Sequence, residues 1–448
     1  MRIAVTTLGC KINQYDSAVI QSRLEEKHSF VPFAEPADFY IINTCTVTDR
    51  ADSEARQLVR RAKRLSPSAK VLVTGCYAQV SSREVAGLEG VDFVVGLNRL
   101  DDLLRLIESR DLVPPSRLFV SDVNKERGVP MLGTRALPGH TRAFLKIQEG
   151  CNYSCTYCII PTARGLSRSV SPGRVLDQVR ALAQAGYAEI VLTGIHLGGY
   201  GQDLTPKMDL TALLELIVSS RLVSRVRLSS LDPREVSDRL LGLIAASEVI
   251  CPHLHVCAQA GDDRVLKQMR RNYDTAFYRD LLAKARERLP EAALGSDIIV
   301  GFPGESEDQF DRSLEYFDSL PLTYFHVFPY SERRGTLAAS LPEPVFAPQR
   351  KTRAQRMRRL GAEKKKQFCV RFRGRRLPVL IEAKIEPKSG WSRGFTRNYL
   401  PVIVSGAHER VNQEVDVQID RFNGDCLTGT ALPPRESLKA ETLPVHSG

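Results

Sequence analysis

The sequence predicts an α/β protein with an N-terminal doubly wound parallel sheet, a central partial (β/α)6 barrel and a small C-terminal antiparallel β-barrel. Two series of short apolar strands alternate with segments of helical periodicity, which is typical of parallel sheets with crossover helices. In a last series, turn residues separate short β-like runs, which favours an antiparallel barrel. We expect the three parts to span residues 1–125, 138–368 and 370–436.

The first series starts at the N-terminus. Apolar, β-branched runs predict strands at residues 3–7, 39–43, 70–74 and 92–95, and helical spacing predicts helices at 13–26 and 49–65. The periodicity is lost between Pro114 and Pro138, where Pro and Gly residues indicate a linker.

The second series predicts strands at 143–148, 189–193, 226–230, 253–257, 296–300 and 324–328. Helices are expected between them at 172–185, 210–220, 233–246, 273–289 and 307–319. Such a series favours an open or partial barrel, whose active site lies at the carboxyl ends of the strands. A helix at 348–368 and β-runs at 377–383, 400–405, 414–419 and 428–432 complete the chain.

The composition is that of a globular protein. The chain has 448 residues, of which 43% are hydrophobic and 26% charged. No apolar run is long enough for a membrane span, and no charged leader precedes an apolar core. We therefore expect a cytoplasmic protein without a membrane partner. In a reducing compartment its ten cysteines are expected to bind metal, act in catalysis or fill the core, rather than form disulfides.

Three cysteines lie on one short loop after the first strand of the second series. Cys151, Cys155 and Cys158 have C-x3-C-x2-C spacing, which lets three thiolates wrap one [4Fe–4S] cluster. Three protein ligands leave one iron open to an exogenous ligand, as in a catalytic metal site. The alternatives are three buried cysteines or a structural zinc site. A structural zinc site requires four protein ligands, and the loop offers no fourth at usable spacing.

A second set of cysteines follows the first three predicted strands. Cys10, Cys45 and Cys76 are expected to converge, because the carboxyl ends of neighbouring parallel strands meet at one edge of a sheet. The alternative is that they are small buried side chains. Each, however, neighbours Gly, Asn or Thr rather than lying within an apolar strand. The set predicts a second cluster with an open iron, which Gly9 and Gly75 let the backbone approach.

The positive charge is concentrated in one segment. Between Arg350 and Arg376 lie thirteen Lys or Arg residues and one acidic residue, Glu363, so the rest of the chain is nearly neutral although the total is +11. The alternative is a solvated helix face, but a run of like charges on a helix is costly unless another group neutralises it. With Arg393, Arg397 and Arg410 in the terminal barrel, the pattern favours a polyanion partner such as RNA.

The motifs carry a family resemblance. The C-x3-C-x2-C loop, with Tyr157 before its last cysteine, resembles the radical S-adenosylmethionine superfamily. The two cysteine sets together resemble the methylthiotransferases, over essentially the whole chain. Segments 9–17, 193–201 and 398–401 are most similar to the branch that modifies threonylcarbamoyladenosine in tRNA. The resemblance implies an N-terminal methylthiotransferase domain with an auxiliary iron–sulfur cluster and a C-terminal RNA-binding TRAM domain.

The resemblance also implies how S-adenosylmethionine is held. The cofactor would chelate the open iron of the Cys151 loop, and its reductive cleavage would release a 5′-deoxyadenosyl radical. Residues implied to contact the cofactor are Tyr157, Gly194, Ser229, Ser230, Ile299 and Gly301. The chain departs from the family pattern at residues 193–196 and 257–261. Four cysteines match no cluster pattern and are interpreted as structural: Cys251, Cys257, Cys369 and Cys426.

The implied reaction replaces C–H by C–SCH3 at carbon 2 of N6-threonylcarbamoyladenosine beside the anticodon. It requires two [4Fe–4S] clusters and S-adenosylmethionine. Its partners are the tRNA anticodon stem-loop, an electron donor such as a flavodoxin or ferredoxin, and a sulfur source. Isopentenyladenosine in tRNA or a ribosomal protein is the alternative substrate, although the basic C-terminal region favours RNA. A non-catalytic iron–sulfur RNA-binding protein or redox sensor is the alternative from another class.

Overall fold

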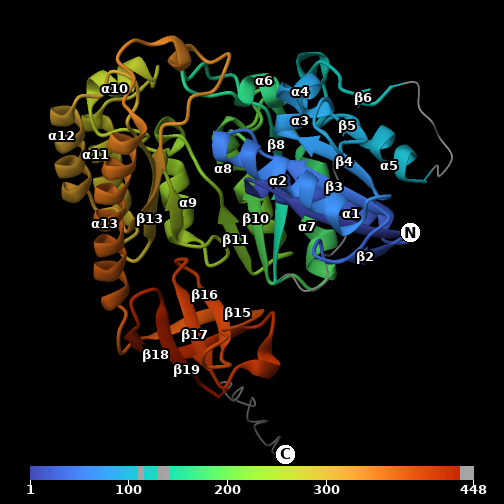
Figure 1. Ribbon diagram of the computed structural model, residues 1–448. Helices are drawn as coiled ribbons and strands as arrows, with labels where there is room; N and C mark the ends of the chain where they lie inside the picture. Colours follow the sequence, from blue (N-terminus) through green and yellow to red (C-terminus); the bar gives the residue numbers. More distant parts are fainter. Residues whose placement is uncertain (109–115, 130–132, 134–140, 434–448) are drawn as a thin grey trace, which may run out of the picture. The chain divides into compact units, whose positions relative to one another are not determined.

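The computed structural model describes residues 1–108, 116–129, 133 and 141–433 (Figure 1). The chain divides into two compact units, Met1–Lys365 and Lys366–Gly448. Parts of the expected linker, including Pro114 and Pro138, lie outside the described residues, as do the expected limits of the central and terminal parts at 138 and 436. The domain limits remain a prediction.

The first unit begins with a parallel sheet of strand order β2-β1-β3-β4-β5-β6. All four strands that the sequence predicts here are present. Strand β6 lies in the segment expected to be a linker, because its pairing with β5 is a contact that periodicity does not reveal. The elements are β1 (Arg2–Thr7), α1 (Lys11–Leu24), β2 (Ser29–Val31), β3 (Phe39–Thr44), α2 (Asp49–Leu65), β4 (Lys70–Gly75), α3 (Cys76–Val80), α4 (Ser82–Ala86), β5 (Phe93–Val95), α5 (Leu100–Glu108) and β6 (Leu118–Phe119).

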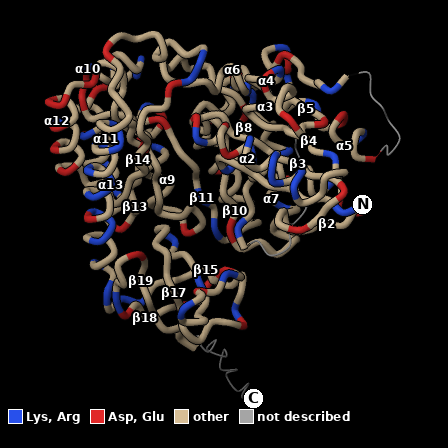
Figure 2. The backbone as a smooth tube through the Cα atoms, viewed as in Figure 1, with Lys and Arg blue, Asp and Glu red and all other residues tan. Residues whose placement is uncertain are grey.

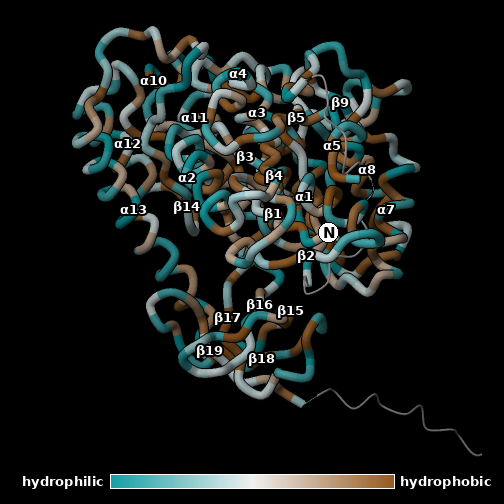
Figure 3. The backbone as a smooth tube through the Cα atoms, turned by 45° about the vertical axis from the view of Figure 1, so that its right-hand side comes forward, coloured by the Kyte–Doolittle hydropathy of each residue, from teal (hydrophilic) through white to brown (hydrophobic). Residues whose placement is uncertain are grey.

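Helices pack on both faces of this sheet. Along β3, Phe39 and Ile41 pack with α1 and α5, whereas Tyr40 and Ile42 pack with α2. This alternation is the period-two geometry of a strand buried on both faces. Figure 3 shows hydrophobic residues along β3 and β4, between the helices. The sheet is doubly wound, as predicted.

The central part of the first unit is a partial barrel of parallel strands. Strands β7, β10 and β11 form one group and β12, β13 and β14 another, and parallel bridges at Val226–Ile250 and Leu231–Val256 join the two. The barrel strands are β7 (Arg142–Lys146), β10 (Glu189–Thr193), β11 (Arg225–Leu228), β12 (His253–His255), β13 (Ala293–Val300) and β14 (Tyr324–Pro329). Strands β8 (Gln148–Glu149) and β9 (Arg168–Ser169) form a separate antiparallel pair. The helices are α6 (Ile160–Arg164), α7 (Pro172–Gln184), α8 (Leu210–Ser220), α9 (Asp238–Ala246), α10 (Asp263–Gln268), α11 (Thr275–Arg288), α12 (Glu307–Ser319) and most of α13 (Ala347–Val370).

A fully buried ion-pair cluster joins β10 to β11. Glu189 accepts hydrogen bonds from Arg225 Nε at 3.0 Å and from Arg227 Nε at 2.8 Å. Burial alone would raise the pKa of Glu189, but the charges of Arg227 and Arg225 outweigh it and lower the pKa to about 2. The folded state therefore binds this proton more weakly than the unfolded chain, in which Glu has a pKa of about 4.3. The stabilisation is complete above the unfolded pKa and is lost as the pH falls toward 2.

Replacing Glu189 by Gln is expected to destabilise the protein by about 3–5 kcal/mol, because two buried guanidinium groups lose their anion. Urea unfolding at pH 7 measures this difference between wild type and variant. At pH 3 the difference in unfolding free energy between the two proteins should be smaller. The wild-type protein has then lost part of the stabilisation that its Glu189 carboxylate provides. A difference in unfolding free energy that is absent at pH 7, or that grows in acid, would contradict the assigned charges.

Helix α13 carries much of the basic segment, and two of its arginines form ion pairs with carboxylates of the first unit. Arg353 is buried and pairs with Glu305 at 2.8 Å and Glu307 at 3.0 Å, and Arg356 pairs with Glu307 at 3.0 Å and Asp311 at 2.7 Å. Figure 2 shows the acidic residues of α12 and the basic residues of α13. The sequence shows only Glu363 within the basic segment, because the carboxylates that pair with Arg353 and Arg356 lie more than forty residues earlier in the chain.

The second unit contains a closed barrel of order β15-β16-β17-β19-β18. Its strands are β15 (Arg376–Ile385), β16 (Ser392–Thr396), β17 (Pro401–Ser405), β18 (Glu414–Phe422) and β19 (Leu427–Ala431). The pairing is antiparallel as predicted, except between β17 and β19, which run parallel. Among the described residues of the chain, no helix is both long and apolar enough to cross a membrane.

Candidate active site

The three N-terminal cysteines converge at one edge of the first sheet, as the sequence predicts. Each follows one of the neighbouring strands β1, β3 and β4, and Cys10 occupies the N-cap of α1 without a side-chain capping bond. The Sγ atoms of Cys10 and Cys76 each lie 3.9 Å from Asn13 Oδ1. Cys45 lies beside Gly9, where an added Cβ would come within 3.0 Å of its Sγ atom.

Two glycines make this convergence possible. Gly9 and Gly75 have φ angles of +102° and +94°, in a region that side chains other than hydrogen rarely permit. A Cβ on Gly75 would also lie 2.3 Å from the Thr44 carbonyl oxygen. The backbone therefore closes tightly around the three thiols only because both positions lack a side chain.

The electrostatics of this site suit a metal cluster. Burial raises the pKa of Cys76 to about 12, although the nearby Arg164 acts to lower it. Burial likewise raises the pKa of Cys45. Thiols of this kind stay protonated until a metal displaces the proton. Three converging thiols with a buried cation beside them fit a [4Fe–4S] cluster with one open iron.

The second cysteine loop runs from β8 to α6, and hydrogen-bond donors contact its thiols too. The Tyr153 N–H donates to Cys151 Sγ at 3.4 Å, and Arg271 Nη1 donates to Cys155 Sγ at 3.0 Å. Burial raises the pKa of Cys158 to about 12. Burial acts to lower the pKa of His196, but its hydrogen bonds to Cys151 and Glu235 outweigh this and raise it to about 10. This set of three thiols also fits an open cluster.

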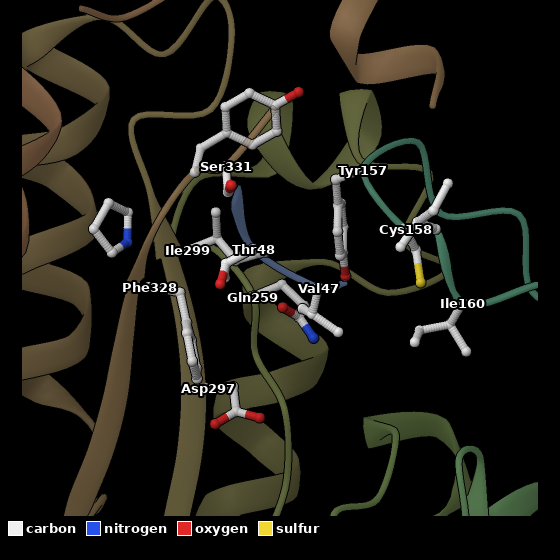
Figure 4. Close-up of a pocket in the computed structure, with 13 residues that line it drawn as sticks. Val47, Thr48, Tyr157, Cys158, Ile160, Gln259, Asp297, Ile299, Phe328 and Ser331 are labelled. Carbon is white, nitrogen blue, oxygen red and sulfur yellow. The ribbon is translucent and has the colours of Figure 1, made fainter. Parts of the chain in front are cut away.

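A pocket of about 210 Å³ lies beside the second loop. Cys158 and Tyr157 from that loop line it, and so do Val47 and Thr48, which closely follow Cys45 in the other set. Figure 4 shows Tyr157 and Phe328 on opposite sides of the pocket. Residues from both cysteine segments therefore share one cavity.

The residues expected to hold S-adenosylmethionine divide into two groups. Tyr157 and Ile299 line the pocket, whereas Gly194, Ser229, Ser230 and Gly301 are not among its lining residues. Ser229 follows β11, and its Oγ is buried without a hydrogen-bond partner in the described part of the chain. An orphaned buried hydroxyl is a suitable contact for a polar cofactor. These assignments remain predictions.

Sequence reasoning missed a polar cluster beside the pocket. Asp297, which lines the pocket, accepts from His255 Nε2 at 3.0 Å and from His326 Nδ1 at 3.1 Å. Cys257 Sγ, interpreted from the sequence as structural, donates to Asp297 Oδ2 at 3.4 Å. Burial acts to raise the pKa of Asp297, but the two imidazoles outweigh it and hold the pKa well below its usual value. The spacing of His255, at the end of β12, and Cys257, two residues later, was the available signal.

A second missed feature is a buried ionic network beside both cysteine sets. Lys146 Nζ lies 2.7 Å from Asp16 Oδ1 and 3.0 Å from Glu149 Oε2. Arg164 Nη1 lies 2.8 Å from Glu149 Oε1, and its Nη2 lies 3.1 Å from Asp16 Oδ2. All four side chains are at most 2% exposed. The network thus fastens α1 of the first sheet to the start of the barrel.

Comparisons with known proteins agree with this geometry. Residues 2–96 match the profile described as "Uncharacterized protein family UPF0004", and residues 145–317 match that of the radical SAM superfamily. The threonylcarbamoyladenosine tRNA methylthiotransferase MtaB of Bacillus subtilis (strain 168) is 39% identical over 93% of both chains. The chain belongs to the radical S-adenosylmethionine methylthiotransferase family.

Other relatives of this methylthiotransferase carry related names. MtaB of Aquifex aeolicus (strain VF5) is 38% identical over 91% of this chain and 98% of its own. A tRNA-2-methylthio-N(6)-dimethylallyladenosine synthase of Staphylococcus epidermidis is 32% identical over 96% of this chain and 84% of its own. The predictions of a radical enzyme of this family and of its iron–sulfur and S-adenosylmethionine cofactors are confirmed.

The fold has a solved counterpart. The radical S-adenosylmethionine methyltransferase TsrM from Kitasatospora setae superposes with a TM-score of 0.53 at 17% identity, over 75% of this methylthiotransferase and 77% of TsrM. At that identity the likeness concerns the fold alone. Together with the two parallel sheet systems and the closed terminal barrel, it confirms the predicted fold class.

Proposed function

We propose that this methylthiotransferase modifies N6-threonylcarbamoyladenosine beside the anticodon of tRNA, giving 2-methylthio-N6-threonylcarbamoyladenosine. Support comes from its relatives: three named for threonylcarbamoyladenosine are 35–39% identical, whereas one named for dimethylallyladenosine is 32% identical. The observation that carries the proposal is the shared pocket. Its walls come from the Cys151 loop and from the segment after Cys45.

In this proposal each cysteine set holds one cluster. Cys151, Cys155 and Cys158 would hold the [4Fe–4S] cluster that binds S-adenosylmethionine, and Cys10, Cys45 and Cys76 would hold the auxiliary one. When bound, these groups supply the reductive cleavage of S-adenosylmethionine and the site for the transferred sulfur. Such chemistry suits carbon 2 of the base, which has no acidic proton and no leaving group for acid–base catalysis to act on.

The pocket residues would hold a flat aromatic group away from water. Tyr157, Ile299 and Phe328 offer apolar surface, and Gln259 and Asp297 offer hydrogen-bonding groups between and below them (Figure 4). Burial raises the pKa of Tyr157 well above its usual value, so its phenol stays neutral beside the Cys151 loop. We assign cofactor contact to Tyr157, Gly194, Ser229, Ser230, Ile299 and Gly301.

The terminal barrel supports RNA as the partner. Phe395 and Tyr399 stack with ring centroids 5.0 Å apart, and Trp391 is 38% exposed. Aromatic and basic side chains on a small barrel suit single-stranded RNA. We assign this barrel to the TRAM domain and its ligand to the anticodon stem-loop. A flavodoxin or ferredoxin as electron donor, a separate sulfur source and a cytoplasmic location complete the proposal.

The test offers the anaerobically reconstituted enzyme two tRNAs that differ only in the modified adenosine. One carries threonylcarbamoyladenosine and the other isopentenyladenosine, and each is incubated with S-adenosylmethionine and a reductant. We expect nucleoside analysis to find the methylthio product only from the first tRNA. Product only from the second tRNA, or methylthiolation of a ribosomal protein instead, would overturn the substrate assignment.

A further inference from the structure

Arg164 is a buried cation that reaches from one cysteine set to the other. It ends α6, which directly follows the Cys151–Cys158 loop, yet its Nε donates to Cys76 Sγ at 3.4 Å. Its Nη2 donates to Asn13 Oδ1 at 2.6 Å, and Asn13 in turn lies 3.9 Å from the thiols of both Cys10 and Cys76. The guanidinium group therefore lies directly against the auxiliary site.

We propose that Arg164 is a positioning residue for the auxiliary cluster, and that its N–H···S bond to Cys76 raises the reduction potential of that cluster. The inference rests on the proposed function, because it requires an iron–sulfur cluster on Cys10, Cys45 and Cys76. It concerns how Arg164, a residue of this chain, acts on that cluster.

The contacts of Arg164 leave it little freedom. Glu149 and Asp16 accept from its two Nη atoms at 2.8 and 3.1 Å, and the side chain is 1% exposed. Lys146 shares both carboxylates, so the four charges balance within the network. Arg164 acts on Cys76 both through its charge and through its Nε–H, which donates to the sulfur at 3.4 Å. A fixed donor of this kind costs no reorganisation when the charge of its acceptor changes.

The direction of the effect follows from the charge change on reduction. Adding an electron makes a thiolate-ligated cluster more negative, so a hydrogen bond to a ligating sulfur stabilises the reduced form more than the oxidised form. Hydrogen bonds to the sulfurs are among the factors that set cluster potentials. Arg271 makes the corresponding contact with Cys155 at 3.0 Å, but it belongs to the same barrel as that loop. Arg164 instead links the two sites. It contacts the Cys76 sulfur of the auxiliary site and also Glu149, which lies two residues before Cys151.

The experiment isolates the auxiliary cluster in the full-length chain. A Cys151→Ala, Cys155→Ala, Cys158→Ala background removes the other cluster, and the protein is labelled with ¹⁵N only in its arginine side chains. Pulsed electron paramagnetic resonance of the reduced cluster should detect a weakly coupled arginine ¹⁵N nucleus. Adding Arg164→Lys should remove that coupling and lower the midpoint potential. We expect a change of about tenfold in the reduction equilibrium, which corresponds to about 59 mV for one electron.

Lys146→Met is the matched control, because it disturbs the same buried network without removing the Arg164 donor. It should retain the ¹⁵N coupling and shift the potential less than Arg164→Lys does. The labelling result does not depend on whether any Arg164 variant folds. A reduced cluster with no arginine coupling overturns the inference alone. A background protein that binds no cluster overturns both the inference and the auxiliary site of the proposed function.

Discussion

Replacing Cys45 by Ala is expected to abolish methylthio transfer while cleavage of S-adenosylmethionine continues. Cys45 is buried beside Gly9 and belongs to the set that would hold the auxiliary cluster. The Cys151 loop, with its own donors from Tyr153 and Arg271, is untouched by the change. Product formation should fall by a factor of about 10³ or more, as when a member of a catalytic unit is removed.

Two measurements check this expectation. Iron should fall from about eight to about four atoms per chain, which is the loss of one cubane. Release of 5′-deoxyadenosine should persist in the same anaerobic reaction in which the methylthio nucleoside disappears. Cys426→Ala makes the same chemical change in the terminal barrel, where Cys426 Sγ donates a hydrogen bond to Asn423 Oδ1, and should leave both products unchanged. Continued methylthio transfer by the Cys45 variant would remove the basis for a second cluster.

Replacing Cys155 by Ala is expected to abolish cleavage of S-adenosylmethionine as well as methylthio transfer. Cys155 lies on the loop beside the pocket and accepts a hydrogen bond from Arg271. Loss of this ligand leaves two thiols, which is too few to hold an open cluster of the kind proposed. Both products should fall by a factor of about 10³ or more. Iron should again fall by about one cubane, because the Cys10 set is intact.

The comparison of the two variants is more informative than either alone. The Cys45 variant should lose the methylthio nucleoside but still release 5′-deoxyadenosine, whereas the Cys155 variant should lose both products. If the Cys155 variant still releases 5′-deoxyadenosine, its loop is not the site of cleavage. Circular dichroism of each reconstituted variant distinguishes a loss of product caused by the missing ligand from a loss caused by general unfolding.

The convergence of the three N-terminal cysteines could be predicted because their placement follows from simple periodicity. Cys10, Cys45 and Cys76 each follow a readable apolar strand, and neighbouring parallel strands end at one edge. Strand β16 was missed, because its five residues contain Arg and Gly rather than an apolar run. Its Gly394 is needed for packing: a Cβ there would lie 2.5 Å from the Leu380 carbonyl oxygen of β15. Pairing of this kind is a tertiary contact that overrides local propensity.

The polar groups around the cysteines could not be read from the sequence. Arg164 and Asp16 are 148 positions apart, and His326 and Asp297 are 29 apart on separate strands. Each of these residues taken alone is typical of a solvated surface. Only the folded chain shows that Arg164 and Lys146 are buried against carboxylates and a thiol.

The pairing of α13 with α12 has a consequence for salt sensitivity. Each phosphate that a protein cation neutralises releases condensed counterions, and this release sets how steeply RNA affinity falls with ionic strength. Arg353 and Arg356 are already matched by carboxylates of the first unit, and Lys364 donates to the carbonyl oxygens of Asp318 and Leu320. These side chains release few ions on contact with tRNA. The affinity should therefore depend on salt less steeply than thirteen clustered cations would suggest.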